Sequence, residues 1–245
     1  MKECVSFGPN GSGKSTLINM LKNNDIHLGE YCNADDYKRY INQSHNFNFD
    51  LIDRHFDFIA FREEFMSSPL FDKANGKDLL ASISSENNTL KVEDSYFVND
   101  YFTSFLADYV RRRLLKTSSK FTFETVMSHP SKLEFMKEAK DNGFKVYLYF
   151  ISLGDPLINV ERVKNRVLEG GHDVEKEKIV SRYSKTMDNL YRAIMIANES
   201  YIFDNSHTEP KLFAIVKNRQ IEFQQMNIPA WFNTYVLKKI SDNSY

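Results

Sequence analysis

The sequence predicts a doubly wound α/β fold, in which helices flank a mostly parallel sheet. Short apolar runs alternate with longer segments whose apolar residues recur at helical spacing, and this alternation is typical of a parallel sheet. A glycine-rich loop lies between the first apolar run and the first helical segment. We expect a single domain over 1–245, because 245 residues are within the range of one large α/β domain.

The expected elements follow one another in order. Pro156 is expected in the first turn of a helix and Gly143 at the end of another, because these residues are typical of helix starts and stops. The run 144–152 is the clearest buried strand, and 211–224 is expected to be a hairpin that turns near Asn218. Strands are expected at 3–7, 28–36, 120–128, 144–152 and 201–205, and helices at 14–24, 97–115, 131–143, 155–171, 174–200 and 229–240.

The region of about 40–93 interrupts this alternation. It is rich in Phe, Asp and Asn and shows little periodicity beyond FDFIAFREEF. Loops of this length in a compact domain are usually functional or mobile. We expect an insertion here, partly helical and at the surface, near the functional site of the protein.

Composition and charge exclude several classes of protein. Hydrophobic residues make up 42% and charged residues 27%, with a formal net charge of -1, so no basic excess points to nucleic acid. No apolar run approaches the roughly 18 residues of a membrane span, and we expect no signal peptide before the first strand. The two cysteines, Cys4 and Cys32, lack metal-ligand spacing. We expect buried thiols and a cytoplasmic location.

The glycine-rich loop matches G-x-x-x-x-G-K-[ST], the motif of a phosphate-binding P-loop. Its glycines let successive N–H groups point at phosphate oxygens, and the next helix adds its positive dipole end. Lys14 is expected on the β- and γ-phosphates, and the Ser15 hydroxyl on Mg²⁺. The fold is therefore expected to be that of a P-loop NTPase, which binds a nucleoside triphosphate with Mg²⁺ through Gly8, Pro9, Asn10, Gly11, Ser12, Gly13, Lys14, Ser15 and Thr16.

Asp35 is the candidate catalytic base. It follows the second expected strand in the run NADD, and ligands of open α/β sheets lie beyond the carboxyl ends of strands. A carboxylate there can take the proton of an incoming hydroxyl. The alternative is a helix N-terminus, where Asn and Asp are favoured. We expect Asp36 to be the cap or a surface residue.

Glu124 follows an aromatic run in the expected strand 120–128, with Thr125 beside it. A carboxylate at a strand end needs solvent, a partner or a metal. Glu124 and Thr125 are expected to bind the hydroxyls of the acceptor, or Glu124 a metal-bound water. A salt bridge at the rim of the sheet is the alternative.

Paired arginines mark a segment of about 162–182 that resembles a lid. Arg162 and Arg166 lie four residues apart on one helical face, and Arg182 lies on the next expected helix. Arginines over a phosphate site stabilise the charge of the transferring group. The alternative is solvated helix charges paired with Glu161 and Glu175. His172, after Gly170-Gly171, is more typical of a hinge or cap than of a general base.

Asp204 is a second candidate for a carboxylate at the site, because an apolar strand that ends in Asp is typical of a Walker B motif. The run DNS is also typical of a turn, so Asp204 ranks below Asp35. The chain has no LSGGQ-like run and no apolar strand that ends in Asp-Glu, which argues against transporter-type and DNA-repair ATPases.

Taken together, these stretches resemble the zeta-toxin family of P-loop kinases, and most closely its zeta-toxin-like or "predicted ABC-type ATPase" branch. The resemblance covers roughly 1–40 and 95–217. GGHDV after paired arginines is its most specific marker beyond the P-loop. The motifs appear in the order of that branch: GPNGSGKSTL, NADD, FETVMS, RVKNRVLEGGHDV, SRY and FDNS.

The resemblance implies a small-molecule kinase that uses ATP or GTP with Mg²⁺. The studied toxins phosphorylate a sugar hydroxyl of UDP-N-acetylglucosamine, and an antitoxin protein blocks their ATP site. By motif, Lys14 and Ser15 match the P-loop residues, Asp35 the base and Glu124 the acceptor-binding carboxylate. Arg166 and Arg182 match the phosphate-binding arginines, although Arg162 could take the place of Arg166. Where this chain has FETVMS, the branch more often has Thr-Leu after the first Thr of the motif. The contacts to the acceptor are therefore expected to differ.

Three hypotheses follow from the sequence. The first is a phosphotransferase to a small hydroxylated acceptor, such as a nucleotide sugar. The second is an ATP-hydrolysing switch or a nucleic-acid-linked P-loop ATPase, which the near-neutral charge disfavours. The third is a nucleotide-binding partner protein without turnover.

Overall fold

The chain folds into two compact units, which are Met1–Gly29 with Thr122–Tyr245, and Glu30–Phe121. This computed structural model describes residues 2–6, 8–168, 173–207 and 209–242, the first of these ranges by its backbone alone. The expected insertion of about 40–93 lies within the second unit, which also contains β2, α2 and α5.

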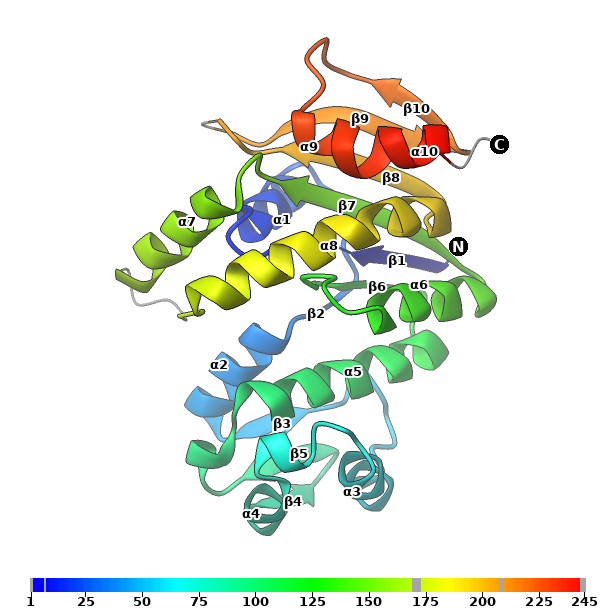
Figure 1. Ribbon diagram of the computed structural model, residues 1–245. Helices are drawn as coiled ribbons and strands as arrows, with labels where there is room; N and C mark the ends of the chain where they lie inside the picture. The colour runs from blue at the N-terminus through cyan, green and yellow to red at the C-terminus, as the bar shows by residue number, and fades with distance from the viewer. Residues whose placement is uncertain (1, 7, 169–172, 208, 243–245) are drawn as a thin grey trace. The chain divides into compact units, whose positions relative to one another are not determined.

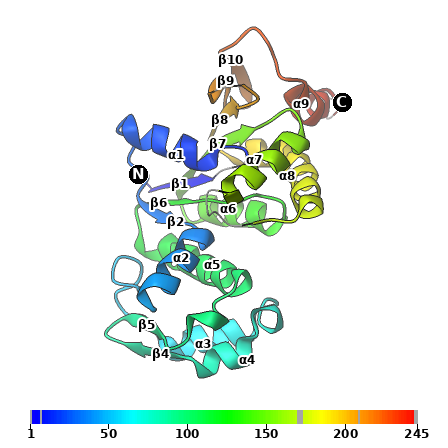
Figure 2. The same ribbon diagram turned by 90° about the vertical axis from the view of Figure 1, so that its left-hand side faces the viewer.

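The first unit is a sheet with helices on both faces (Figures 1 and 2). Figure 2 shows α1 on one face and α6 and α8 on the other. Its strands are β1 (Lys2–Ser6), β6 (Lys120–Phe123), β7 (Phe144–Ser152), β8 (Glu199–Asp204), β9 (Lys211–Lys217) and β10 (Gln220–Phe223). Its helices are α1 (Lys14–Asn23), α6 (Ser131–Asp141), α7 (Pro156–Leu168), α8 (Lys176–Ile196), α9 (Ala230–Phe232) and α10 (Lys238–Asp242).

The strand order in this unit is β10-β9-β8-β7-β1-β6. β7 pairs in parallel with β1 on one side and with β8 on the other, and β8, β9 and β10 continue as an antiparallel edge. β7 is buried on both faces over Phe150–Ser152, as expected for a central parallel strand. The expected doubly wound fold is confirmed, and β7 has the bounds that its apolar run predicts.

The expected C-terminal hairpin is also confirmed, with its turn at Asn218 and Arg219. Both residues have positive φ, 51° and 63°, which is the backbone of a two-residue type I′ turn and matches the twist of the paired strands. The expectation of one continuous helix over 229–240 is wrong. The chain instead forms three short segments here, α9, a π-helical stretch at Asn233–Leu237, and α10.

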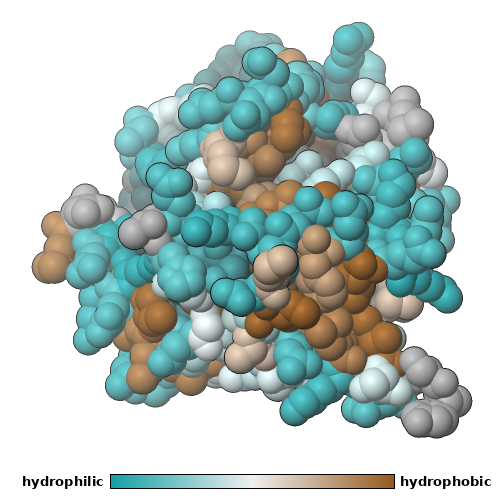
Figure 3. All heavy atoms as spheres, turned by 90° about the horizontal axis from the view of Figure 1, so that it is seen from above, coloured by the Kyte–Doolittle hydropathy of each residue, from teal (hydrophilic) through white to brown (hydrophobic). Residues whose placement is uncertain are grey.

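Apolar side chains reach the surface in the side of the molecule shown in Figure 3, in groups separated by hydrophilic ones. In the first unit, the exposed apolar residues include Phe223, Met226 and Ile228, in and after β10. Exposed apolar residues are ordinary at protein surfaces, so this group by itself indicates no partner. Among the described residues, no helix combines the length and the apolar character that crossing a bilayer requires.

The second unit has its own sheet, which the sequence did not predict. β3 (Asn46–Asn48), β5 (Thr89–Val92) and β4 (Ile83–Glu86) form an antiparallel sheet in that order. The expectation of a partly helical surface insertion is therefore incomplete. The helices of this unit are α2 (Ala34–Ser44), α3 (Phe58–Met66), α4 (Gly76–Ala81) and α5 (Asp100–Thr117), and β2 (Glu30–Cys32) is its first strand.

Aromatic side chains form the core of the second unit. Phe61 is fully buried and packs edge-on against Tyr109, with ring centroids 5.0 Å apart. Phe65 lies 4.8 Å from Phe105, and Phe49 stacks on Phe56 at 3.9 Å. The unit therefore has a core of its own, built from Phe residues of the region 40–93, including the periodic run FDFIAFREEF, and from aromatic residues of α5.

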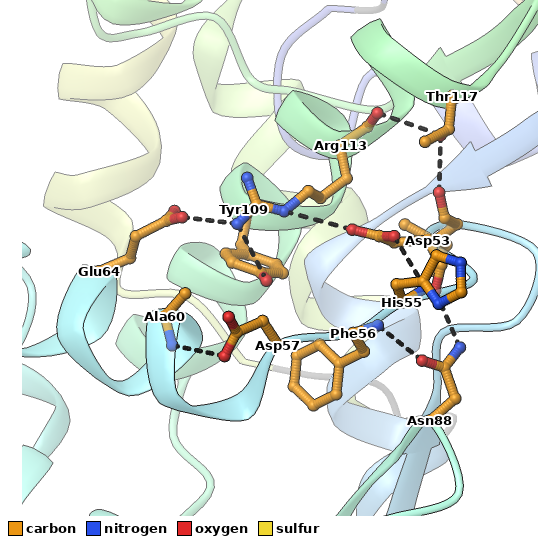
Figure 4. Close-up of polar contacts among 11 residues, drawn as sticks. Asp53, His55, Phe56, Asp57, Ala60, Glu64, Asn88, Tyr109, Arg113 and Thr117 are labelled. Atoms are coloured by element: carbon orange, nitrogen blue, oxygen red, sulfur yellow. Dashed lines mark hydrogen bonds and ion pairs between the residues drawn. The ribbon is translucent and has the colours of Figure 1, made fainter.

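Polar contacts close this core at its rim (Figure 4). The Arg113 guanidinium contacts Glu64 at 2.6 Å and Asp53 at 3.6 Å, and it lies 4.3 Å over the Tyr109 ring. The Asn88 amide accepts from the Phe56 N–H at 2.7 Å and donates to the Asp53 carbonyl at 2.8 Å. These contacts fix the segment between β3 and α3, which has no regular structure of its own.

Candidate active site

The P-loop leads from β1 into α1, as its motif requires. Gly13 is the N-cap of α1, and its carbonyl accepts from the Leu17 N–H at 3.0 Å. Gly11 and Gly13 have φ of 68° and 98°, a region that side chains other than glycine rarely adopt. The loop thus has the curled backbone that directs N–H groups toward an anion at a helix N-terminus.

Two P-loop side chains fold back onto the loop itself. The Lys14 ammonium and the Ser12 hydroxyl both donate to the Pro9 carbonyl, at 2.8 Å each. Lys14 is 9% exposed and Ser12 is fully buried. A phosphate bound in the loop would compete with Pro9 for the Lys14 ammonium.

Glu124 lies beside the P-loop, directly after β6. Its Oε1 is 3.5 Å from Lys14 Nζ, and the side chain is 13% exposed. Of the sequence-predicted residues, Lys14 and Glu124 are thus brought together in the first unit. The expected strand 120–128 is shorter than predicted, because β6 ends at Phe123. The salt bridge expected as the alternative for Glu124 is therefore present, and the partner of Glu124 in it is the P-loop lysine.

Thr125 begins a tight loop that α8 holds in place. Its hydroxyl accepts from the N–H of Met127, which has φ of 60°. The side chains of Thr186 and Asn189 donate to the carbonyls of Val126 and Met127, at 2.6 and 3.0 Å. These two α8 residues fix the backbone next to Glu124, and no sequence motif predicted them. Two polar residues on the buried face of an amphipathic helix were the available signal.

The arginines have different environments. Arg162 donates from its guanidinium to the Asn205 carbonyl at 2.9 Å. Arg166 is exposed in the last turn of α7, and Arg182 is half-buried in α8. Apolar contacts among Val160, Val163 and Ile179 pack α7 against α8. The predicted hinge Gly170-Gly171 and His172 lie outside the described residues.

A tyrosine of α8 anchors the chain just after β7. The Tyr183 hydroxyl donates to the Leu153 carbonyl at 2.7 Å. Burial raises the pKa of Tyr183 to about 12, so the hydroxyl keeps its proton and remains a donor over the physiological range. This contact fixes α8, the helix that carries Arg182, next to the end of a central strand.

Asp35 lies in the second unit, in the first turn of α2. β2 ends at Cys32, which is earlier than expected, and Asn33 is the N-cap whose side chain accepts from the Asp35 N–H at 2.8 Å. The Asp35 side chain is exposed, whereas Asp36 pairs with Arg39 at 3.1 Å. The cap is thus Asn33 and not Asp36. Asp35 sits at a helix N-terminus, where a negative charge is favoured.

Asp204, the second candidate carboxylate, anchors the C-terminal segment. Its Oδ1 accepts from the Trp231 indole at 2.9 Å and from the Ser206 hydroxyl at 2.8 Å. The next residue, Asn205, is the one that contacts the P-loop, through a 2.8 Å hydrogen bond from its amide to the Ser12 carbonyl. The run DNS therefore combines a structural aspartate with a loop-contacting asparagine.

The Ser15 hydroxyl, the predicted Mg²⁺ ligand, is exposed in the first turn of α1. Within the described ranges, the chain has no group of three or more His, Cys, Asp and Glu side chains placed to hold a metal ion. A single hydroxyl ligand, that of Ser15, fits Mg²⁺, because this ion keeps several waters and is usually held by one or two protein groups together with substrate phosphates. Ser15 would be the protein's ligand.

The predicted burial of the two cysteine thiols is confirmed for Cys32 and stays a prediction for Cys4. Cys32 is buried, and its thiol donates to the Ala107 carbonyl at 3.3 Å within the second unit. The side chain of Cys4 lies outside the described residues. A buried thiol engaged in this way is a packing residue rather than a metal ligand.

Comparison with solved structures shows that the fold is that of a zeta-toxin-like P-loop kinase. The chain is similar to a crystal structure of AvrRxo1-ORF1:ORF2 with ATP, with a TM-score of 0.57 and 16% identity over 91% of this chain and 61% of that chain. It is also similar to a structure of the PezAT chromosomal toxin–antitoxin system of Streptococcus pneumoniae, with a TM-score of 0.51 and 11% identity over 97% of this chain and 79% of that chain. The resemblance in fold that the motifs predicted is thereby confirmed.

The sequence comparisons reach less far. An uncharacterized protein of Haemophilus influenzae is 38% identical over 69 residues, which are 28% of this chain and 49% of that protein. No family model matches the chain. The chain thus spans about three fifths of the AvrRxo1 chain, and the sequence match covers about half of the Haemophilus protein.

Proposed function

We propose that this chain is a phosphotransferase of the zeta-toxin type that transfers the γ-phosphoryl group of ATP or GTP to a hydroxyl of a small acceptor. The observation that carries the proposal is the P-loop lysine beside a nearly buried carboxylate, with 3.5 Å between Lys14 Nζ and Glu124 Oε1. Loop, lysine and carboxylate bring a triphosphate site and an acceptor-binding group to one edge of the sheet. The ATP bound in the AvrRxo1 complex agrees with a nucleotide in this fold.

The roles follow from the chemistry of each group. The P-loop N–H groups and Lys14 hold the β- and γ-phosphates, and Glu124 with Thr125 binds the acceptor. The acceptor oxygen forms a bond to the γ-phosphorus, the bond from that phosphorus to the bridging oxygen breaks, and Asp35 takes the hydroxyl proton. Arg166 and Arg182 stabilise the charge that spreads over the transferring group. Mg²⁺, held by Ser15 and the phosphates, supplies further charge neutralisation when bound.

The acceptor class is a nucleotide sugar, with UDP-N-acetylglucosamine as the first candidate because of the motif resemblance. An antitoxin protein is the proposed partner, since the similar AvrRxo1 structure is of an ORF1:ORF2 pair and the other similar structure comes from the PezAT toxin–antitoxin system. The formal net charge of -1 does not favour a nucleic-acid partner.

The test is a transfer assay on the full chain. The protein is mixed with MgATP or MgGTP and a panel of nucleotide sugars, and phosphorylated products are identified by mass spectrometry. We expect a product with one acceptor class, and Lys14→Ala should abolish it. Hydrolysis without transfer, at a rate that nucleic acid stimulates, would instead indicate a P-loop ATPase. Tight ATP binding without either reaction would indicate a binding protein.

A further inference from the structure

The P-loop needs partners on its outer side as well as on its inner side. When the N–H groups of a loop converge on an anion, the carbonyl groups of the same peptides point outward, and buried carbonyls require donors. Two of these carbonyls accept from asparagine side chains. Asn159 Nδ2 donates to the Asn10 carbonyl at 2.6 Å, and Asn205 Nδ2 donates to the Ser12 carbonyl at 2.8 Å.

Both asparagines are deeply buried and come from separate elements. Asn159 is fully buried on α7, and Asn205 is 6% exposed directly after β8. The Asn205 side-chain amide packs against Gly13 and the Asn159 backbone packs against Gly11, the two P-loop glycines with positive φ. A Cβ at Gly13 would lie 2.4 Å from Asn205 Nδ2, and a Cβ at Gly11 would lie 2.7 Å from the Asn159 carbonyl oxygen. The glycines are thus required by these contacts as well as by their backbone angles.

Asn205 is itself held from both sides. Its N–H donates to the Ser152 carbonyl at the end of β7, at 2.9 Å, and its carbonyl accepts from Arg162 at 2.9 Å. Arg162 lies three residues after Asn159, on the same face of α7. One helix face therefore reaches the P-loop twice, directly through Asn159 and indirectly through Arg162 and Asn205.

We propose that Asn159, Arg162 and Asn205, here called the amide brace, are positioning residues that hold the P-loop in its phosphate-binding shape. Arg162 acts through Asn205 and does not serve as a phosphate-binding arginine. The inference rests on the proposed function in one respect, that the loop binds a nucleoside triphosphate. It assigns a role to three residues for which the P-loop motif has no position.

The brace depends on the hydrogen-bond donors of the amides and not on their volume. Asn205→Ala removes the donor to the Ser12 carbonyl, and Asn205→Asp replaces it with an acceptor-only carboxylate. When protonated, that carboxyl regains one O–H donor. Burial at this position, next to the Ser12 carbonyl, would raise the pKa of the introduced carboxyl. The Asp variant should therefore recover part of its function at low pH, whereas the Ala variant should not.

The test measures the dissociation constants of MgATP and MgADP by calorimetry at pH 8.0 and 5.5, with thermal melting in parallel. We expect Asn205→Ala to weaken both nucleotides about tenfold, the effect of one lost hydrogen bond of ordinary strength. Asn205→Asp should bind at least as weakly at pH 8.0 and recover toward wild type at pH 5.5. The matched control is Asn198→Ala, which removes an asparagine contact to the Val146 N–H at the other end of β8 and should leave both affinities unchanged.

A second variant keeps the test decisive if Asn205→Ala does not fold. Arg162→Gln should weaken MgADP as much as MgATP, because the loop that wraps both is disturbed. Combined with Asn205→Ala or Asn205→Asp, it should add little further loss, because residues that act through one another are not additive. Lys164→Ala, at an exposed position of the same helix, should change neither affinity.

The outcomes separate this inference from the proposed function. If the wild type binds nucleotide and the Asn205 variants bind equally well at both pH values, the brace is overturned. Fully additive losses for Arg162 and Asn205, or a loss in Asn198→Ala as large as in Asn205→Ala, would overturn it as well. If the wild type binds neither nucleotide, the proposed function fails and the brace fails with it.

Discussion

Asp35 is the single residue on which the proposed transfer depends most, because it is the group assigned to take the proton. We expect Asp35→Asn to lower the turnover number by about 10²- to 10⁴-fold, the usual contribution of a positioned general base. The nucleotide dissociation constant should stay within about twofold, since the P-loop is unchanged. Steady-state transfer kinetics and calorimetry on the same preparations measure the two quantities.

The neighbouring carboxylate supplies the control for Asp35. Asp36 lies in the same first turn of α2 and pairs with Arg39, so Asp36→Asn has a similar effect on the helix N-terminus. It should leave turnover nearly unchanged. If both variants lose turnover equally, the effect comes from α2 and the assignment of the base is wrong.

Arg182 tests the stabilisation of charge on the transferring group. We expect Arg182→Ala to reduce the turnover number on the order of 10²- to 10³-fold while nucleotide affinity changes much less, because the charge that it neutralises develops in the transition state. Arg192→Ala, at an exposed position near the end of the same helix, is the control. Equal losses in turnover and affinity for Arg182→Ala would show ground-state binding of the nucleotide instead.

At the scale of elements, the β8–β9 pair carries a charge pair whose effect depends on pH. Glu199 and Lys217 are register partners, with 2.8 Å between Oε1 and Nζ. The hydrogen bond from Lys217 lowers the pKa of Glu199. A carboxyl whose pKa is lower in the folded state stabilises the fold above its unfolded-state pKa, and this contribution is lost as the pH falls through the folded-state pKa.

Glu199→Gln should therefore reduce the free energy of unfolding at pH 7 by a few tenths to about 1 kcal/mol, the range of partly exposed ion pairs. The difference from wild type should shrink as the pH is lowered from about 5 to about 3. Urea unfolding of both proteins at about pH 5 and at about pH 3 measures this difference in the free energy of unfolding. Glu222→Gln on β10 should show no such dependence, because the Glu222 carboxylate accepts from the neutral Gln224 amide. A constant difference for Glu199→Gln would contradict the assignment.

Local chemistry made several elements predictable from the sequence. β7 is a mostly apolar run, interrupted only by Lys145 near its start and ending in Ser152, as is typical of a strand buried between parallel neighbours. The β9–β10 turn has Asn218 at a position of positive φ, where asparagine is tolerated. Pro156 begins α7, as its missing N–H and fixed φ favour. In each case the cause lies within a few residues of the effect.

Other elements depend on contacts that the sequence does not display. β3, β5 and β4 are three or four residues long, and the pairing of β3 with β5 joins residues about 40 positions apart. Asn33 ended the second expected strand early because its side chain caps α2. The amide brace was missed for the same reason, since Asn159 and Asn205 contact a loop about 150 to 190 residues away. A polar residue on the apolar face of α7 was the one sequence signal for it.

At the scale of the whole molecule, the two compact units have separate cores, and this predicts separate responses to mutation and to ligand. Phe61 is fully buried among the aromatic rings of the second unit, whereas the P-loop belongs to the first. Phe61→Ala should destabilise the unit Glu30–Phe121 by about 3–5 kcal/mol, through lost contacts and the cavity left behind. Ile59→Ala, at an exposed position of α3, should cost far less.

Nucleotide should stabilise the first unit by mass action, by about 2.7 kcal/mol at 100 times its dissociation constant. Hydrogen exchange read by mass spectrometry resolves the two units on the intact chain. We expect MgATP to slow exchange in α1 and β7 to a similar extent in wild type and in Phe61→Ala, while the variant exchanges faster throughout α3 and α5. Nucleotide affinity should survive the variant, because the P-loop, its brace and Glu124 all belong to the first unit. If Phe61→Ala instead abolishes ATP protection of α1, the two units unfold as one cooperative body, and the prediction of separate responses is wrong.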